Sequence, residues 1–289
     1  ILRELIPNHD VVHVHGSLYH SSWTAIRLAK RAHKPVVLTE HVGAVPYKNP
    51  IIRGIQRAAY TLAGSRALRS ADRIIVLTEE VRAHVAALRG STAGISLIPN
   101  GVDTTLFTPA SAPQRAAKKA ALGVPKRSTL VVFNGRLIEK KGYQLVLDAL
   151  TENDHAVCIG SGTPEARFAN KPNITFVGTV PQTTVCTILQ AADCFVLPSV
   201  GEGFPVATME ALACGVPVVL SDTPSNRHYV PATAAVYVER TAASVRAGIA
   251  TAHTRAPKLR AAARTLATKH MSITQSAQAL ANVYYEVLA

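Results

Sequence analysis

Short runs of β-branched and other apolar residues alternate with helical patterns along almost the whole chain, and this alternation limits the possible folds most strongly. In the first third, the runs that predict buried strands span 10–15, 35–39, 73–78 and 95–99, and helical patterns span 21–33, 50–71 and 79–88. Strands and helices that alternate in this way pair the strands in parallel through right-handed crossovers. The sequence therefore predicts a doubly wound α/β sheet.

A segment rich in proline and turn-forming residues, 98–114, interrupts the alternation. Strands are predicted again at 129–134, 155–160, 173–178, 193–198, 217–221 and 234–238, with helix from 241 onward that breaks at Pro257 and near Ser272. We therefore expect two α/β domains, 1–108 and 109–272, and a final helical segment, 273–289. The strand at 10–15 is apolar enough to be central in its sheet, so we expect the first domain to be incomplete at its beginning.

Composition narrows the class of protein. Hydrophobic residues make up 48% and charged residues 17% of the 289 residues, which is typical of a globular protein. The longest apolar run is shorter than the roughly 18–20 residues that span a bilayer. The formal net charge of +13 favours anionic ligands or surfaces, or serves solubility alone. The four cysteines lack metal-binding spacing, so we expect a reduced, cytoplasmic protein without structural disulfides or a bound metal.

Two carboxylates stand eight positions apart where a predicted strand turns into a helix. Glu202 lies at the turn and Glu210 one to two turns into the helix. Gly203 allows a ligand to approach the backbone, and because Pro205 has no N–H, Phe204 and Val206 are the expected donors. A helix start at the carboxyl end of a parallel strand suits a phosphate. Taken alone, the pair fits equally well a helix-dipole carboxylate and a surface glutamate.

Two cations frame a second turn between a predicted strand and a predicted helix. The stretch GRLIEKKG, 135–142, contains Arg136 next to its first glycine and Lys141 next to its last. Cations held there would stabilise a diphosphate leaving group as it gains charge. In isolation, a solvated basic turn explains the stretch as well.

Together, the E-x7-E spacing of Glu202 and Glu210 and the G-R-L-x-x-x-K-G pattern of 135–142 resemble the retaining GT-B glycosyltransferases of the glycosyl transferases group 1 family. The resemblance implies a GT-B fold, in which two Rossmann-like domains face a cleft and the C-terminal helix packs back on the first domain. It also implies transfer of a hexosyl group from a nucleoside-diphosphate sugar to an acceptor hydroxyl with retention, by a front-face mechanism. The nucleoside-diphosphate sugar is the expected donor substrate, and neither a metal nor a cofactor is expected.

The resemblance also assigns roles to residues. Glu202 would contact the donor sugar near the anomeric carbon, and Glu210 the ribose hydroxyls. Arg136 and Lys141 would hold the diphosphate. The backbone at Thr179 and Val180 would contact the base.

His13 and His15 alternate on the first predicted strand, and His41 follows the second. By the same resemblance, His41 would lie near the donor sugar, and it is the expected catalytic histidine. His13 is predicted to be a satisfied strand-end histidine, while the role of His15 stays open.

Three alternatives remain at this point. The chain is a nucleotide-sugar-binding GT-B fragment without turnover, or a GT-B epimerase, or a nucleic-acid binder, which the 5% aromatic content and the lack of a recognition motif disfavour. The acceptor is expected to be lipid-linked or a polysaccharide. The basic amphipathic segment 49–73 offers peripheral contact with an anionic membrane, but a packed helix with a solvated arginine side is the favoured interpretation.

Overall fold

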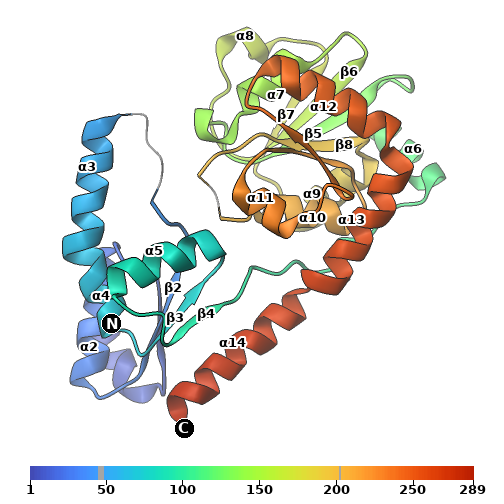
Figure 1. Cartoon of the computed structure of the whole chain (residues 1–289). Coiled ribbons are helices and arrows are strands. Elements are labelled where there is room, and N and C mark those ends of the chain that lie inside the picture. Colours follow the sequence, from blue (N-terminus) through green and yellow to red (C-terminus); the bar gives the residue numbers. More distant parts are fainter. Residues whose placement is uncertain (45–48, 202) are drawn as a thin grey trace. The chain divides into compact units, whose positions relative to one another are not determined.

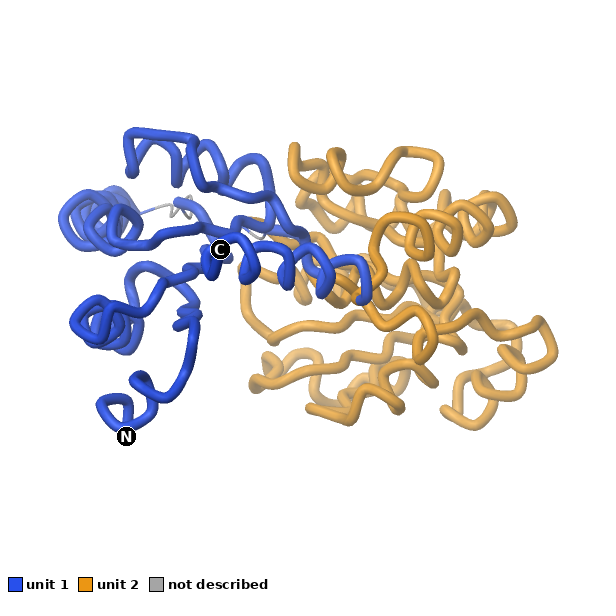
Figure 2. Tube along the Cα trace, turned by 90° about the horizontal axis from the view of Figure 1, so that it is seen from below, with its two compact units in different colours: residues 1–100, 201–204, 274–289 blue, residues 101–200, 205–273 orange. Residues whose placement is uncertain are grey.

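The computed structural model describes residues 1–44, 49–201 and 203–289 (Figure 1). The chain divides into two compact units, which Figure 2 colours separately. Unit 1 contains Ile1–Asn100, Gly201–Phe204 and Thr274–Ala289, and unit 2 contains Gly101–Val200 and Pro205–Ile273. Each unit is an α/β fold built on its own parallel sheet, as the alternation predicts.

Unit 1 has a four-stranded parallel sheet in the order β1-β2-β3-β4. Its strands are β1 (Val12–His15), β2 (Val36–Glu40), β3 (Arg73–Val76) and β4 (Ile95–Leu97). Its helical elements are α1 (Leu2–Leu5), η1 (Ile6–Asn8), α2 (His20–Arg31), α3 (Pro50–Ala59), η2 (Tyr60–Gly64), α4 (Ser65–Ser70), α5 (Glu79–Arg89) and α14 (Ile273–Leu288), of which Ile273 is counted with unit 2. All four predicted strands are confirmed, because each is a β-branched run between helices.

The sheet of unit 1 buries both of its faces. Successive residues of a strand point to opposite faces, and Val36 and Leu38 therefore join the cluster formed with α2, α4 and α5. Val37 and Ile75 point the other way and pack against Val283 of α14. The final helix thus forms the second covering layer of this unit.

Unit 2 has a six-stranded parallel sheet in the order β10-β9-β8-β5-β6-β7. Its strands are β5 (Thr129–Asn134), β6 (Asp154–Ile159), β7 (Ile174–Gly178), β8 (Cys194–Leu197), β9 (Val218–Ser221) and β10 (Ala235–Val238). Its helical elements are α6 (Ala112–Ala121), η3 (Glu139–Lys141), α7 (Tyr143–Ala149), α8 (Ala166–Ala169), α9 (Gln182–Ala191), α10 (Val206–Ala213), α11 (Pro224–Tyr229), α12 (Ala242–Thr254) and α13 (Ala256–His270). The six strands predicted here are also confirmed.

Two helical segments differ from the sequence-based expectation. The segment 50–71 is divided by a π-helical turn, η2, so that α3 and α4 are separate helices. The predicted break at Pro257 lies two residues earlier, at Arg255, because proline fits the first turn of α13. The break near Ser272 is confirmed, and Ser272 forms a parallel bridge with Val102 there.

Candidate functional site

The strand order of unit 2 reverses between β5 and β8. The chain passes from β5 outward to β6 and β7, and then returns to place β8 on the other side of β5. At such a switch point the loops after the two strands diverge and leave a crevice beyond their carboxyl ends, where ligands of open α/β sheets bind. The loop after β5 carries Arg136 and Lys141, and the loop after β8 leads to α10.

The loop after β5 is a tight turn. Gly142 ends it with φ +74°, and a Cβ atom at this position would lie 2.7 Å from the Pro198 carbonyl oxygen, so only glycine fits. The stem of Lys141 packs over Gly135, with its Cδ 3.6 Å from where a Cβ of that glycine would lie. Arg136 is exposed, while Lys141 is half-buried.

Backbone hydrogen bonds join this loop to its neighbours. The Leu137 N–H donates to the Ser161 carbonyl (2.8 Å) after β6, and the Val200 N–H donates to the Lys140 carbonyl (3.1 Å) from the loop after β8. Loops from adjacent strands thus support one another at the carboxyl edge of the sheet.

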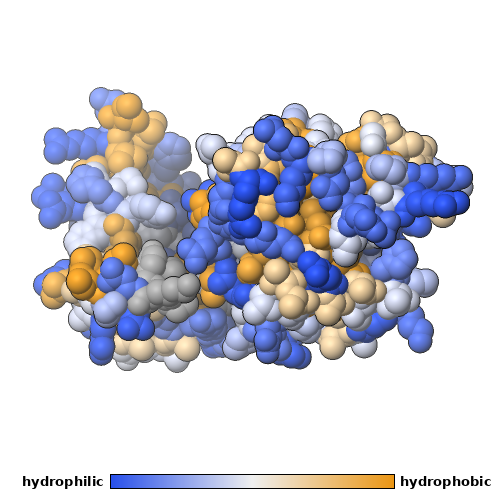
Figure 3. Space-filling view, turned by 90° about the horizontal axis from the view of Figure 1, so that it is seen from above, coloured by the Kyte–Doolittle hydropathy of each residue, from blue (hydrophilic) through white to orange (hydrophobic). Residues whose placement is uncertain are grey.

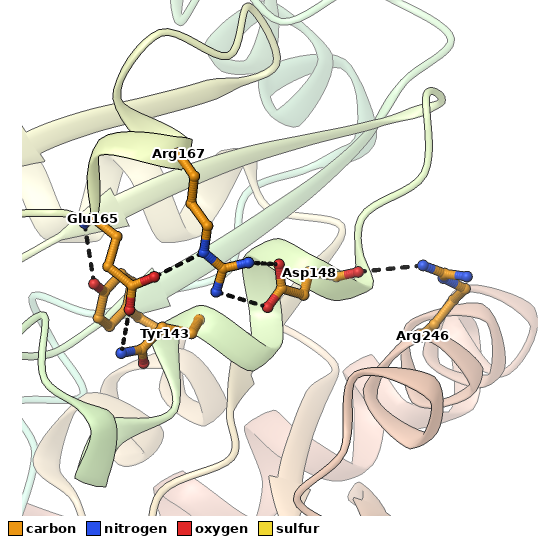
Figure 4. A network of polar contacts seen from close by, with 6 residues as sticks. Tyr143, Asp148, Glu165, Arg167 and Arg246 are labelled. Carbon is orange, nitrogen blue, oxygen red and sulfur yellow. Dashed lines mark hydrogen bonds and ion pairs between the residues drawn. The ribbon is translucent and has the colours of Figure 1, made fainter.

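A polar network holds the helix that follows the loop. Arg167 binds the Asp148 carboxylate with both terminal nitrogens (2.6 and 3.0 Å) and donates through Nε to Glu165 (2.7 Å), as Figure 4 shows. Arg246 donates to the Asp148 carbonyl oxygen (3.2 Å). Because Asp148 lies on α7, these bonds fix the helix whose start is formed by the cationic loop.

Glu210 is a buried carboxylate beside the end of β5. It is 7% exposed, and its Oε2 accepts a hydrogen bond from Asn134 Nδ2 (3.4 Å). Burial raises the pKa of its carboxyl group. The alternative of a surface glutamate is therefore wrong: α10 is buried from Thr208 to Ala213, on its polar positions as well as its apolar ones.

The other predicted contacts fall in both units. Thr179 and Val180 follow β7, and Val206 begins α10, all in unit 2. Gly203 and Phe204 are grouped with unit 1. Phe204 is buried. A Cβ at Gly203 would lie 3.3 Å from the His41 carbonyl oxygen, which explains the small residue. Glu202 lies outside the described residues.

Three histidines form a cluster at the carboxyl end of β1 and β2 in unit 1. His15 Nδ1 and His41 Nε2 are 2.9 Å apart, and the rings of His13 and His15 stack with centroids 4.5 Å apart. His13 contacts the hydroxyls of Thr39 (2.8 Å) and Tyr284 (2.6 Å). The prediction of a satisfied His13 is confirmed, whereas the contribution of Tyr284 from α14 was not predicted.

The surroundings of His13 and His41 disfavour the charged forms of these two rings. Burial, and then the neighbouring His15 and His41, lowers the pKa of His13 to about 4. Burial and His15 lower the pKa of His41 as well. The contact between His15 and His41 fits one nitrogen that donates and one that accepts.

This arrangement predicts a stability change with pH. The unfolded chain protonates His13 near its ordinary pKa of 6.5, whereas the folded chain does so only near 4. Stability is therefore full at pH 7 and falls as the pH drops from about 6.5 to about 4. We expect His13→Phe to flatten the loss measured by urea unfolding in this window. His253→Gln, at an exposed position, is the control, and an unchanged slope in His13→Phe contradicts the assignment.

Glu40 fixes the loops that follow β1 and β2. It is 4% exposed, and its Oε2 accepts the Ser17 N–H (2.9 Å). The backbone N–H groups of His41 and Val42 also bind its carboxylate. Burial raises the pKa of this group, and the hydrogen bonds oppose the rise. Glu40 is thus a positioning residue for His41 that the sequence pattern did not reveal.

We expect Glu40→Gln to destabilise unit 1 by about 2 kcal/mol, because an amide NH₂ would then face backbone donors in a buried site. Urea unfolding measures the change. Glu79→Gln, at an exposed position of α5, is the matched control with an expected change below about 0.5 kcal/mol. Equal stability of the two variants would contradict the positioning role.

The described residues hold no group of three or more histidine, cysteine, aspartate or glutamate side chains that could bind a metal ion. All four cysteines are free and buried. Across the described ranges, no helix is both long and apolar enough to cross a membrane.

Comparison with known families assigns both parts of the chain. Residues 114–270 match the family model described as glycosyl transferases group 1, and residues 1–106 match glycosyltransferase family 4. The chain belongs to the glycosyl transferases group 1 family. The matched range includes the β5 loop, Glu210 and the β5/β8 switch point, and the family expected from the sequence is confirmed.

Several relatives of this family member are known. TuaC of Bacillus subtilis, a glycosyltransferase assigned to teichuronic acid biosynthesis, is 31% identical over 223 residues, or 76% of this chain and 54% of TuaC. The D-inositol 3-phosphate glycosyltransferase of Mycobacterium tuberculosis is 31% identical over 73% of this chain and 46% of that protein. This chain thus spans about half the length of the curated relatives it matches.

Solved structures agree with the fold of a group 1 member. Anabaena HepE, solved with UDP and glucose, has a TM-score of 0.82 at 18% identity and covers 97% of this chain and 79% of HepE. Sucrose-phosphate synthase from Thermosynechococcus elongatus has a TM-score of 0.79 at 22% identity, with 97% and 74% covered. The predicted GT-B fold with two Rossmann-like domains is therefore confirmed.

Proposed function

We propose that the protein is a retaining glycosyltransferase that moves a hexosyl group from a nucleoside-diphosphate sugar to an acceptor hydroxyl. The observation that carries this proposal is the β5/β8 switch point, where the loop of Arg136 and Lys141 and the buried Glu210 share one edge of the sheet. HepE was solved in complex with UDP-glucose, which supports a donor of this class.

In the proposed reaction the bond between the anomeric carbon and the diphosphate breaks, and the acceptor oxygen bonds to the same face of the sugar. The acceptor proton passes to the departing diphosphate, which needs no separate side-chain base. Arg136 and Lys141 stabilise the growing charge of the diphosphate. Glu202 holds the sugar near the anomeric carbon, and Glu210 accepts hydrogen bonds from the ribose hydroxyls.

Further contacts complete the proposed site. Backbone groups at Thr179 and Val180 contact the base, and those at Gly203, Phe204 and Val206 approach the donor. His41 donates to a sugar hydroxyl, which a neutral imidazole can do through its N–H. The proposed reaction uses neither a metal nor an additional cofactor, because the side chains of Arg136 and Lys141 supply the positive charge at the diphosphate.

For the acceptor, we propose a lipid-linked or polysaccharide hydroxyl and peripheral contact with an anionic membrane on the cytoplasmic side. Support comes from one relative, which is assigned to teichuronic acid biosynthesis. The segment 49–71 adds four arginines and no acidic residue.

Titration of the chain with UDP-, GDP- and ADP-glucose tests the proposal. We expect one nucleotide to bind, and Glu210→Ala to weaken that binding about tenfold, because a charge-assisted hydrogen bond is lost. Leu122→Ala, outside the switch point, is the control. NMR of the product then shows whether the anomeric configuration is retained. Binding without turnover would favour a non-catalytic binding module, and binding of none of the three would contradict the proposal.

A further inference from the structure

Helix α3 turns its apolar side to solvent. Ile51 is 70% and Ile55 65% exposed, and Leu62 of the following turn is 62% exposed. No residue of α3 is buried. Hydrophobic residues also reach the surface at the left of Figure 3, the side on which α3 lies in Figure 1. A packed surface helix buries its apolar side. The arginines Arg53 and Arg57 are exposed as expected, but the expectation that the apolar side of α3 packs inward is wrong.

The polar side of the same helix covers a hollow within unit 1. Residues 53, 56, 57, 60 and 61 recur at helical spacing and face α5. The hollow measures about 760 Å³, and its polar lining consists of Arg53, Gln56, Arg57, Tyr60, Thr61 and His84. Two exposed cationic side chains therefore border an open volume.

Three polar side chains of the hollow, Arg53, Arg57 and His84, have side-chain nitrogens without partners among the described residues. The guanidinium groups of Arg53 and Arg57 form no hydrogen bond or ion pair with any residue in the described ranges. The buried Nε2 of His84 likewise has no hydrogen-bond partner among the described residues. Its ring stands edge-on to Tyr60 at 4.8 Å, and burial lowers its pKa. An unpartnered buried nitrogen beside two unpaired cations favours a polar, anionic ligand.

The hollow adjoins the loop that carries His41. Tyr60 donates its hydroxyl hydrogen to the Val42 carbonyl (3.2 Å), Gly43 packs beside His84, and Ala44 lines the hollow. The lining therefore begins three residues after the histidine that the proposed function places at the donor sugar.

We propose that this hollow binds a phosphate group carried by the acceptor, with Arg53 and Arg57 as its main ligands and His84 as a third. The identification of the ligand as the acceptor rests on the proposed function. The phosphate site itself is inferred from the residues of the hollow alone. Planar guanidinium groups bind phosphate through paired hydrogen bonds, and a neutral imidazole can donate one more. The volume exceeds that of a phosphate alone, which leaves room for the adjoining sugar or headgroup.

Calorimetric titration with glucose 6-phosphate, with excess UDP present to occupy the donor site, tests the inference on the whole chain. We expect the double variant Arg53→Gln/Arg57→Gln to bind at least about tenfold more weakly, and His84→Phe several-fold more weakly. Lys126→Gln/Arg127→Gln, at exposed positions of unit 2, removes the same charge and should bind like the wild type. Equal binding by the two double variants would overturn the inference.

Vesicle co-sedimentation distinguishes the sources of the phosphate. If phosphatidylglycerol vesicles, but neither phosphatidylcholine vesicles nor glucose 6-phosphate, bind in a manner that depends on Arg53 and Arg57, the phosphate belongs to a lipid headgroup. Vesicle binding that the double variant leaves unchanged counts against the hollow. UDP-sugar binding should stay the same in every variant. If UDP-sugars fail to bind while glucose 6-phosphate follows the predicted pattern, the proposed function fails and the phosphate site remains.

Discussion

Replacing Lys141 by alanine is expected to lower the rate of sugar transfer by about a thousandfold. In the proposed reaction the diphosphate gains charge as the sugar bond breaks, and a fixed cation stabilises that state more than the bound substrate. Lys141 suits this role because its stem is packed over Gly135, in a turn that Gly142 closes against Pro198. The predicted loss, about 4 kcal/mol in activation free energy, is typical of removing one preorganised group.

Lys140→Ala provides the matched control, since it removes the same charge from the adjacent position. Transfer rates measured for both variants under saturating donor should differ by at least about a hundredfold. A similar loss in the two variants would show that only the general charge of the loop matters, and it would contradict the assigned role of Lys141.

Gly160→Ala is expected to lower the free energy of unfolding by about 3 kcal/mol. Gly160 follows β6 with φ +127°, and an added Cβ would lie 2.3 Å from the carbonyl oxygen of Gly135. The clash is with backbone, so a side-chain rotation cannot relieve it, and the strained φ adds its own cost. Since Gly135 belongs to the cationic loop, nucleotide-sugar binding should weaken as well.

Gly123→Ala separates the two causes. Gly123 also has a positive φ, +72°, but an added Cβ there meets no atom within 4 Å. Urea unfolding should show a cost of about 1 kcal/mol for this variant, and donor binding should not change. A comparable loss of stability in both variants would mean that backbone strain alone, not the contact with Gly135, makes glycine necessary after β6.

The sequence predicts the layers of the fold because each strand is a run of β-branched and other apolar residues that is buried in the sheet of its own unit. It also predicts the turns at Gly142 and Gly203, where small residues precede helices at strand ends. The sequence does not predict which side of a surface helix faces the rest of the protein. The periodicity of α3 separates Ile51 and Ile55 from Arg53 and Arg57, but it carries no information about which side packs inward.

The polar contacts around the histidines also depend on packing that the sequence pattern does not reveal. The alternation in VHVH, residues 12–15, places His13 and His15 on one strand face, so their proximity follows from the pattern. Tyr284 lies 271 positions away from His13, and no local signal pairs them. The burial of Glu40 and Glu210 likewise depends on which strands become neighbours, and that is a property of the folded sheet.

We propose that the carboxyl edge of unit 2 at β5 and β8 holds a nucleoside-diphosphate sugar. Amide NMR of the isotopically labelled chain, titrated with the nucleotide sugar that binds, tests it most directly. We predict that the resonances of Gly135, Lys141, Thr179 and Glu210 shift together and saturate at one dissociation constant. Saturable shifts confined to other parts of the chain, with these four unchanged, would contradict the claim.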